Sequence, residues 1–245
     1  MAQTKRKTPP VTKAAAAAAP DIPATYFDLL NEATQALVVT TPDWDAVDGS
    51  LSRFEKKAGK WKLVGDKVPV VVGKNGLAWD GAIDPISRDA KLIKREGDGR
   101  SPAGIFHVKE AFGFAPSGAN SKLTYRPLTD SIECVDDASS HAYAQIVDRH
   151  EISNPDWSSS EKMRSEDVYK IGAVVDYNNL AIPAAGSCIF LHIWSGSGHG
   201  TAGCTAMDEA QLARTLDWLD ANKHPVLVQL PANEYDRLRK SWQLP

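Results

Sequence analysis

The sequence is most informative at Cys188-Ile-Phe-Leu-His192-Ile-Trp-Ser-Gly-Ser-Gly-His199-Gly-Thr201-Ala-Gly203-Cys204-Thr-Ala-Met207. Apart from its histidine, the run from Cys188 to Trp194 is apolar, which predicts a strand buried on both faces. A loop with four glycines follows, and it returns to a cysteine immediately preceded by glycine. The stretch therefore predicts a β-rich fold with a histidine on a strand and a cysteine on a tight loop.

These residue types suit thiol chemistry. A free cysteine is mostly protonated at neutral pH, so a thiol nucleophile needs a base nearby. His192 would be that base for Cys204, and Gly203 would let the backbone turn sharply and aim its N–H groups at a developing oxyanion. The same residues also fit a buried core histidine and a cysteine that is merely a small apolar side chain. The stretch alone leaves both interpretations open.

A resemblance to a known family favours the chemical interpretation. His192, a glycine-bearing loop and then Thr201-Ala202-Gly203-Cys204 resemble the catalytic signature of the L,D-transpeptidase (YkuD-type) family. A second block, Gly97-Asp98-Gly99-Arg100-Ser101-Pro102-Ala103-Gly104-Ile105-Phe106, resembles the family's Thr/Ser-Pro-x-Gly-x-Phe element. The resemblance extends loosely over residues 35–231, and it is close to a subgroup in which Thr/Val-Ala-Met/Leu follows the cysteine.

Two positions depart from the family pattern. Many members have His or Arg where Ala202 lies, and Arg two residues after the cysteine, where Ala206 lies. The role of that arginine toward a substrate carboxylate therefore cannot be carried over. One of Arg100, Arg149 and Arg164 would take the place of that arginine, and the sequence does not show which one.

The resemblance implies a mainly-β fold, a YkuD-like β sandwich or barrel with a few peripheral helices. It also implies an acyltransferase, an L,D-transpeptidase of cell wall biogenesis and cell shape that acts on peptidoglycan stem peptides without a cofactor. Cys204 would form a thioester with the stem peptide, and His192 would serve as the base. The family's substrate lies outside the cytoplasmic membrane, so we expect a periplasmic or extracellular monomer. We also expect the backbone of Gly203 and Thr201 to stabilise the oxyanion or to orient the imidazole. Trp194, His199 and Thr205 are expected to contact the substrate.

Two other functions fit the same residues. With water as the acceptor, the site would be that of an L,D-carboxypeptidase, and Cys204 and His192 do not distinguish the two reactions. Ala202 and Ala206 fit instead a non-catalytic cell-wall-binding module with a degenerate site. The outcome depends on the reactivity of the thiol and on the acceptor that the site admits.

Two alternative roles concern the histidines. His199 is closer to Cys204 in sequence than His192, but it lies among glycines on a loop that we expect to be exposed. His192, His199 and Cys204 are all zinc-ligand types. Their spacing matches no familiar zinc arrangement and a fourth ligand is not evident, so we expect no metal.

Composition sets broader limits. A chain of 245 residues supports one substantial domain, which we place at residues 21–245. The net charge of −3 gives no argument for nucleic acid or an anionic membrane as a partner. No run approaches the roughly 18 apolar residues of a transmembrane span, so we expect none.

Residues 1–20 form an Ala/Pro/Lys-rich segment. A basic start precedes six alanines, residues 14–19, and then Pro20. This order is that of a secretory signal, but the apolar part is shorter than the roughly 7–15 residues of a typical one. The segment is therefore expected to be a tail, an added leader or a weak export signal.

The three cysteines are Cys134, Cys188 and Cys204. If Cys204 must stay free to react, the other two are available to pair, which would suit an oxidising compartment. The sequence does not show whether their Cα atoms are close enough, so two buried thiols remain the alternative.

Hydrophobic periodicity predicts the other elements. The clearest helix begins after Asp208, and a second helix is expected to begin at Ser158. A short helix is expected at residues 26–34 and an amphipathic tail at 233–242. Many short strands with few helices again predict a mainly-β sandwich or barrel, with strands at 36–41, 51–56, 61–64, 68–72, 104–108, 143–147, 188–194 and 226–230.

Overall fold

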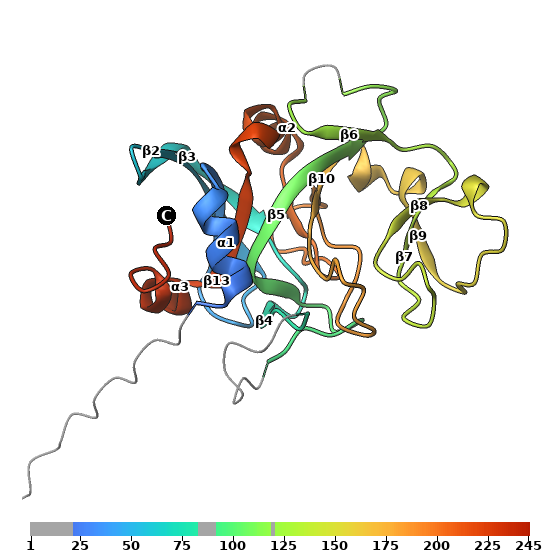
Figure 1. Ribbon diagram of the computed structural model, residues 1–245, viewed down its shortest axis with the longest axis horizontal. Helices are drawn as coiled ribbons and strands as arrows, with labels where there is room; N and C mark the ends of the chain where they lie inside the picture. Colours follow the sequence, from blue (N-terminus) through green and yellow to red (C-terminus); the bar gives the residue numbers. More distant parts are fainter. Residues whose placement is uncertain (1–21, 83–91, 119–120) are drawn as a thin grey trace, which may run out of the picture.

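The computed structural model describes residues 22–82, 92–118 and 121–245 (Figure 1). The segment 1–20, expected to be a tail, leader or export signal, lies outside these residues. The helices and strands of the described chain are α1 (Ala24–Glu32), β1 (Gln35–Thr41), β2 (Asp48–Lys57), β3 (Lys60–Val71), β4 (Leu77–Trp79), β5 (Ser101–Gly113), β6 (Thr124–Pro127), β7 (Ile132–Val135), β8 (Ile146–Asp148), β9 (Ser160–Lys162), β10 (Ile171–Val175), β11 (Phe190–Ile193), β12 (Thr205–Met207), α2 (Glu209–Trp218), β13 (Val226–Pro231) and α3 (Ala232–Leu238).

The main sheet curls until its ends meet. Its strands follow the order β10-β11-β12-β3-β2-β1-β13-β5, and β5 also pairs with β10. The long strand β5 makes this closure possible, because residues 104–107 pair with β13 and residues 108–113 pair with β10. The strands thus form a closed ring, with β4 and β6 added at β5. The mainly-β fold predicted from the sequence is confirmed.

Apolar residues fill the interior of this ring. Leu37, Leu51, Ile105, Leu191 and Met207 are among the largest fully buried side chains, and each comes from a different strand. β-branched and aliphatic side chains on a pleated strand pack well against such a half-enclosed interior. The helices α1 and α3 lie together on one side of the ring (Figure 1).

A second, smaller sheet stands beside the ring. Its order is β8-β7-β9, and Figure 1 shows it at the opposite end of the molecule from α1 and α3. A separate cluster of buried residues joins it to the main sheet, and this cluster contains Cys134, Tyr169, Phe190 and Cys204. The cysteine of the sequence motif therefore lies at the boundary between the two sheets.

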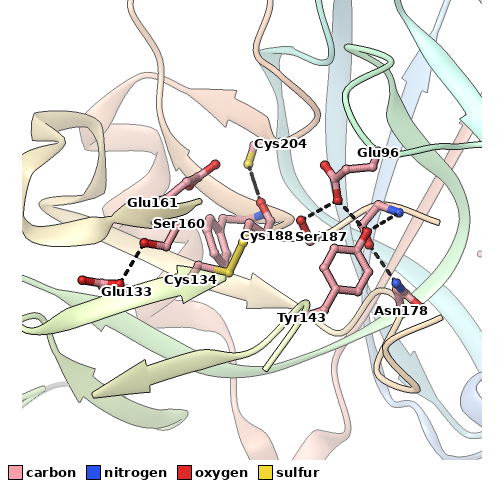
Figure 2. The surroundings of a disulfide bond; sticks show 12 residues. Glu96, Glu133, Cys134, Tyr143, Ser160, Glu161, Asn178, Ser187, Cys188 and Cys204 are labelled. Carbon is pink, nitrogen blue, oxygen red and sulfur yellow. Dashed lines mark hydrogen bonds between the residues drawn. A yellow bond between two sulfur atoms is a disulfide. The ribbon is translucent and has the colours of Figure 1, made fainter. Parts of the chain in front are cut away.

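A disulfide fastens this boundary. Cys134 of β7 is bonded to Cys188, two residues before β11, with the Cα atoms 5.9 Å apart (Figure 2). Of the two possibilities left open by the sequence, pairing of these cysteines is the one observed, and Cys204 is free. Closing a loop of 54 residues is worth about 4 kcal/mol in the chain-entropy model.

Several predicted elements were placed correctly. The helix α2 begins directly after Asp208, whose carboxylate accepts hydrogen bonds from the N–H groups of Ala210 and Gln211. The expected helix at residues 26–34 is α1, and the tail at 233–242 contains α3. In the described part of the chain, no helix combines the length and apolar character needed to cross a membrane.

Other predicted elements were wrong. The expected helix starting at Ser158 is instead the strand β9 followed by short 3₁₀ turns, because residues 160–162 pair with β7. Residues 61–64 and 68–72 belong largely to one strand, β3, in which Gly65 adopts a φ of 68° at a bulge. The expected strand at 143–147 begins only at Ile146, and Tyr143 lies in a turn.

Candidate active site

His192 and Cys204 lie on neighbouring parallel strands. His192 is in β11, and Cys204 directly precedes β12, which pairs with β11 in the register Leu191 with Thr205. This register sets Cys204 opposite Phe190, whose N–H donates a hydrogen bond of 3.3 Å to the cysteine sulfur. Residues 190 and 192 share one face of β11, because side chains alternate along a strand. The fold therefore brings the histidine and cysteine of the motif to one place.

The imidazole has a defined orientation. Its Nδ1 lies 2.7 Å from the carbonyl oxygen of Ile193, which can only accept, so Nδ1 carries the proton and Nε2 is left as an acceptor. Burial lowers the pKa of His192 below its ordinary value. Near neutral pH the ring is therefore uncharged and able to take a proton at Nε2.

The carbonyl that orients the ring differs from the one expected. The sequence interpretation placed it near Thr201, but the Thr201 carbonyl accepts from the N–H of Lys74 at 2.8 Å. The loop before Cys204 runs beside the end of β3, and this pairing occupies the Thr201 carbonyl. The carbonyl of Ile193, adjacent to the histidine, serves instead.

The Cys204 thiol is buried in the resting site. It donates to the carbonyl oxygen of Cys188 at 3.4 Å, as the dashed line in Figure 2 shows. Burial raises the pKa of Cys204 far above its ordinary value, and the charge of Glu161 raises it further. The N–H of Phe190, the charge of Lys94 and the Tyr169 side chain lower it by less. The resting pair is therefore a neutral thiol and a neutral imidazole.

Hydroxyl groups fix the loop that carries the cysteine. Thr201 Oγ1 donates to the carbonyl oxygen of Cys204 at 2.6 Å and accepts from the N–H of Gly203 at 3.1 Å. Ser101 Oγ, from the Gly97–Phe106 block, donates to the same carbonyl at 2.9 Å. The second motif of the sequence thus packs directly on the first.

Close packing disfavours a side chain at Gly203. A Cβ at this position would lie 3.1 Å from Ile189 Cδ1 and 3.2 Å from the carbonyl oxygen of Arg100. Its φ is not among the positive values of the chain, so it is not a left-handed turn that demands glycine. Its N–H, expected as an oxyanion donor, is already engaged by Thr201 in this structure.

A pocket of about 250 Å³ opens onto the two residues. Its wall is formed by His192, by residues 187–189 and 201–204, and by side chains from the small sheet and from the loop before β5. Trp194, His199 and Thr205, which the sequence suggested as substrate contacts, are not part of this wall. Thr205 is fully buried and its hydroxyl donates to Gln229 at 2.6 Å, so it is not available for the substrate contact that the sequence suggested.

The three candidate arginines are engaged elsewhere. Arg100 pairs with Asp45, Arg149 lies 3.5 Å from Glu133, and the guanidinium of Arg164 stacks over Phe114. The cation in the pocket wall is Lys94, whose side chain is 3% exposed and whose Nζ lies 2.8 Å from Asp98. Ala206, at the family's arginine position, is fully buried in β12 opposite His192.

Several acidic and aromatic residues of the wall were missed by the sequence interpretation. They are Glu96, Asp136, Glu161 and Tyr169. Asp137 accepts from Ser139 and Ser158 in a turn, whereas its neighbour Asp136 lines the pocket. Glu161 was assigned to a helix start, and the pairing of β9 with β7 brings it to the pocket instead.

The described residues contain no group of three or more His, Cys, Asp or Glu side chains arranged to hold a metal ion. His199, one member of the zinc set considered from the sequence, is exposed and lies outside the pocket wall. The pocket wall itself brings together a thiol and an imidazole.

Comparison with known proteins identifies the family of the chain. Searches among curated proteins and among solved structures each give no significant match. The family model of the L,D-transpeptidase catalytic domain, YkuD, matches residues 54–228, which include both motifs and the residues that form the pocket. Since this match covers more than half of the 245 residues, the chain belongs to the YkuD family of L,D-transpeptidase catalytic domains.

Proposed function

We propose that this protein is a cysteine-dependent acyltransferase, a peptidoglycan L,D-transpeptidase with Cys204 as nucleophile and His192 as base. The observation that carries the proposal is the pairing of β11 with β12, which sets Cys204 and the oriented, neutral imidazole of His192 on one pocket wall. Residues 21–245 would then form one catalytic domain that acts on stem peptides as a monomer.

In the acylation step, Cys204 loses its proton to Nε2 of His192 as the sulfur attacks the amide carbonyl of the third, L-configured centre of a tetrapeptide stem. Because both groups are neutral at rest, proton transfer accompanies the attack. The carbon–nitrogen bond breaks, His192 returns the proton to the leaving nitrogen, and D-alanine departs. A thioester remains on Cys204.

In the second step, an amine from another stem attacks the thioester. Its proton passes to His192, the carbon–sulfur bond breaks, and the thiolate regains a proton. The product is a cross-link between two stems. Water as the acceptor would give the L,D-carboxypeptidase reaction at the same site.

The oxyanion would be stabilised by the backbone N–H of Cys204, with Gly203 joining only if Thr201 Oγ1 releases its N–H. One such donor contributes about 3 kcal/mol in other acyl-transfer sites. The buried Lys94 adds a positive charge to the pocket where Ala206 supplies none.

The disulfide supports a location outside the cytoplasm. Structural disulfides form and persist in oxidising compartments, and Cys134–Cys188 joins two buried segments rather than exposed reactive ones. We therefore place the protein in the cell envelope, where peptidoglycan is accessible.

The experiment is turnover of purified tetrapeptide stems, with D-alanine release and products followed by mass spectrometry. We expect D-alanine release by the wild-type protein and none by Cys204→Ala, with matching circular dichroism of the two. A dimeric stem product identifies the transpeptidase, and a tripeptide product identifies the carboxypeptidase. Undiminished release by Cys204→Ala would refute the proposed nucleophile. Absence of release by the folded wild-type protein would favour a binding module.

A further inference from the structure

Tyr169 packs against His192 and lies in the same buried cluster and pocket wall as Cys204. It is buried at 6% exposure, and its ring packs edge-on against the imidazole of His192, with the centroids 5.4 Å apart. Its hydroxyl donates to Glu161 Oε2 at 2.7 Å. The Tyr169 side chain also lowers the pKa of the Cys204 thiol, which belongs to the same pocket wall. The phenolic proton is therefore held by a carboxylate in the pocket wall that also contains the sulfur.

Glu161 is placed to control that proton. It lies in β9 opposite Cys134, and Figure 2 shows its carboxyl and the Cys204 thiol on the same side of the disulfide. Burial raises the pKa of Glu161 to about 7, while the hydrogen bond from Tyr169 lowers it. The charge of Glu161 in turn raises the pKa of the Cys204 thiol.

Other charged groups surround Glu161. The carboxylates of Asp136, Glu166 and Glu96 all raise the pKa of Glu161. Glu96 accepts from Tyr143 and Ser187, as Figure 2 shows. Across the pocket, Lys94 pairs with Asp98 and the imidazole of His192 is bonded to Ile193. Of these groups, Glu161 is the one hydrogen-bonded to Tyr169.

We infer that Tyr169 is a further catalytic residue, which hydrogen-bonds to the sulfur of Cys204, and that Glu161 is a positioning residue that acts through Tyr169. The inference rests on the proposed function. During attack the thiol proton goes to Nε2 of His192, while Tyr169 keeps its own proton and donates it in a hydrogen bond to the sulfur. A neutral Glu161 leaves that donor free for the sulfur. A charged Glu161 draws the donor away and adds a negative charge beside the thiolate.

The first test measures the rate at which iodoacetamide alkylates Cys204 in the full chain. This rate reports on thiolate formation without any substrate. Tyr169→Phe keeps the ring contacts and removes only the hydroxyl. At pH 6 we expect its alkylation rate to fall about tenfold or more, the scale of a hydrogen bond to a charged group. The matched control is Tyr26→Phe, which loses a buried bond of 2.9 Å to Asp80 outside the pocket and should alkylate at the wild-type rate. Equal rates for Tyr169→Phe and wild type would overturn the role of Tyr169.

The second test is the pH dependence of the same reaction in Glu161→Gln, which stays neutral at every pH. The ratio of its alkylation rate to the wild-type rate should be near one at pH 5.5, where both side chains are neutral. It should rise to about tenfold by pH 8.5, the change that one pKa unit of the thiol produces. The control is Glu133→Gln, which replaces a buried carboxylate of β7 outside the pocket. The ratio of its alkylation rate to the wild-type rate should stay constant with pH. A constant ratio for Glu161→Gln would overturn the role of Glu161.

These outcomes separate the inference from the proposed function. If the wild type releases no D-alanine but the alkylation rates behave as stated, the proposed function fails and the control of the thiol by Tyr169 and Glu161 stands. If turnover is normal and Tyr169→Phe leaves both turnover and alkylation unchanged, the inference fails alone. Should Tyr169→Phe not fold, the rate ratio of Glu161→Gln still tests the pair.

Discussion

Breaking the Cys134–Cys188 disulfide should both destabilise the protein and disturb the Cys204 thiol. The bond closes a loop of 54 residues and ties the small sheet to the segment before β11. Cys188 is held at a φ of 54°, in the left-handed region that non-glycine residues seldom adopt, and its carbonyl accepts from the Cys204 thiol. The disulfide thus restrains a strained residue that touches the proposed nucleophile.

The expected magnitude combines two terms. Freeing the loop in the unfolded chain removes about 4 kcal/mol of stability. Allowing residue 188 to leave the left-handed region returns roughly 1–2 kcal/mol to the folded state. We therefore expect reduction to lower the free energy of unfolding by about 2–3 kcal/mol. Turnover should fall as well, because the relaxed carbonyl no longer positions the thiol.

Urea denaturation, followed by tryptophan fluorescence and extrapolated linearly to water, measures this difference. The oxidised protein is compared with the same protein kept reduced by dithiothreitol. The control is the double variant Cys134→Ala/Cys188→Ala, whose denaturation curve should not respond to dithiothreitol. A change below about 0.5 kcal/mol on reduction would refute the estimate based on loop closure. An equal response in the double variant would show that the effect arises elsewhere.

Three further predictions concern single side chains. His192→Ala should lower turnover about 10²-fold or more, the scale of general base catalysis. His199→Ala, on the exposed loop, should leave turnover nearly unchanged. If the folded His199 variant loses more turnover than the His192 variant, the base is His199. Gly203→Ala should reduce turnover while the fold persists, because the added Cβ would press on Ile189 and on the Arg100 carbonyl. Wild-type kinetics in this variant would show that the loop accommodates the added Cβ without disturbing the site. Asp208→Ala should lower the free energy of unfolding by about 1 kcal/mol, because α2 loses its cap, and should leave the activity unchanged. Thermal denaturation measures this loss, and a rise in stability would contradict the prediction.

The sequence was informative where local chemistry determines structure. The motif from Cys188 to Met207 indicated the histidine, the cysteine and the β-rich context together, and the family match confirms the resemblance. Asp208 marked the start of α2, since a side-chain cap acts within one turn. These features depend on neighbours in the chain and so can be predicted from the order of residues.

The parts that could not be predicted depend on pairing between distant segments. Glu161 looked like a helix start, and only its pairing with β7 brings it to the pocket. The disulfide was left open because no sequence pattern fixes the distance between two Cα atoms. The carbonyl that orients His192 was placed near Thr201, whereas that loop pairs with the segment just after β3 and leaves the role to Ile193.

The central claim is that Cys204 is an activated acyl-accepting nucleophile, and covalent trapping tests it most directly. A β-lactam presents a strained amide, and membership of the YkuD family leads us to expect acylation by a carbapenem. With Cys134 and Cys188 joined in a disulfide, Cys204 is the free thiol. We predict a single carbapenem adduct by intact mass spectrometry, located by peptide mapping to Cys204 and missing from Cys204→Ala. Prolonged incubation of folded protein without an adduct, or an adduct that persists in Cys204→Ala, would contradict the claim.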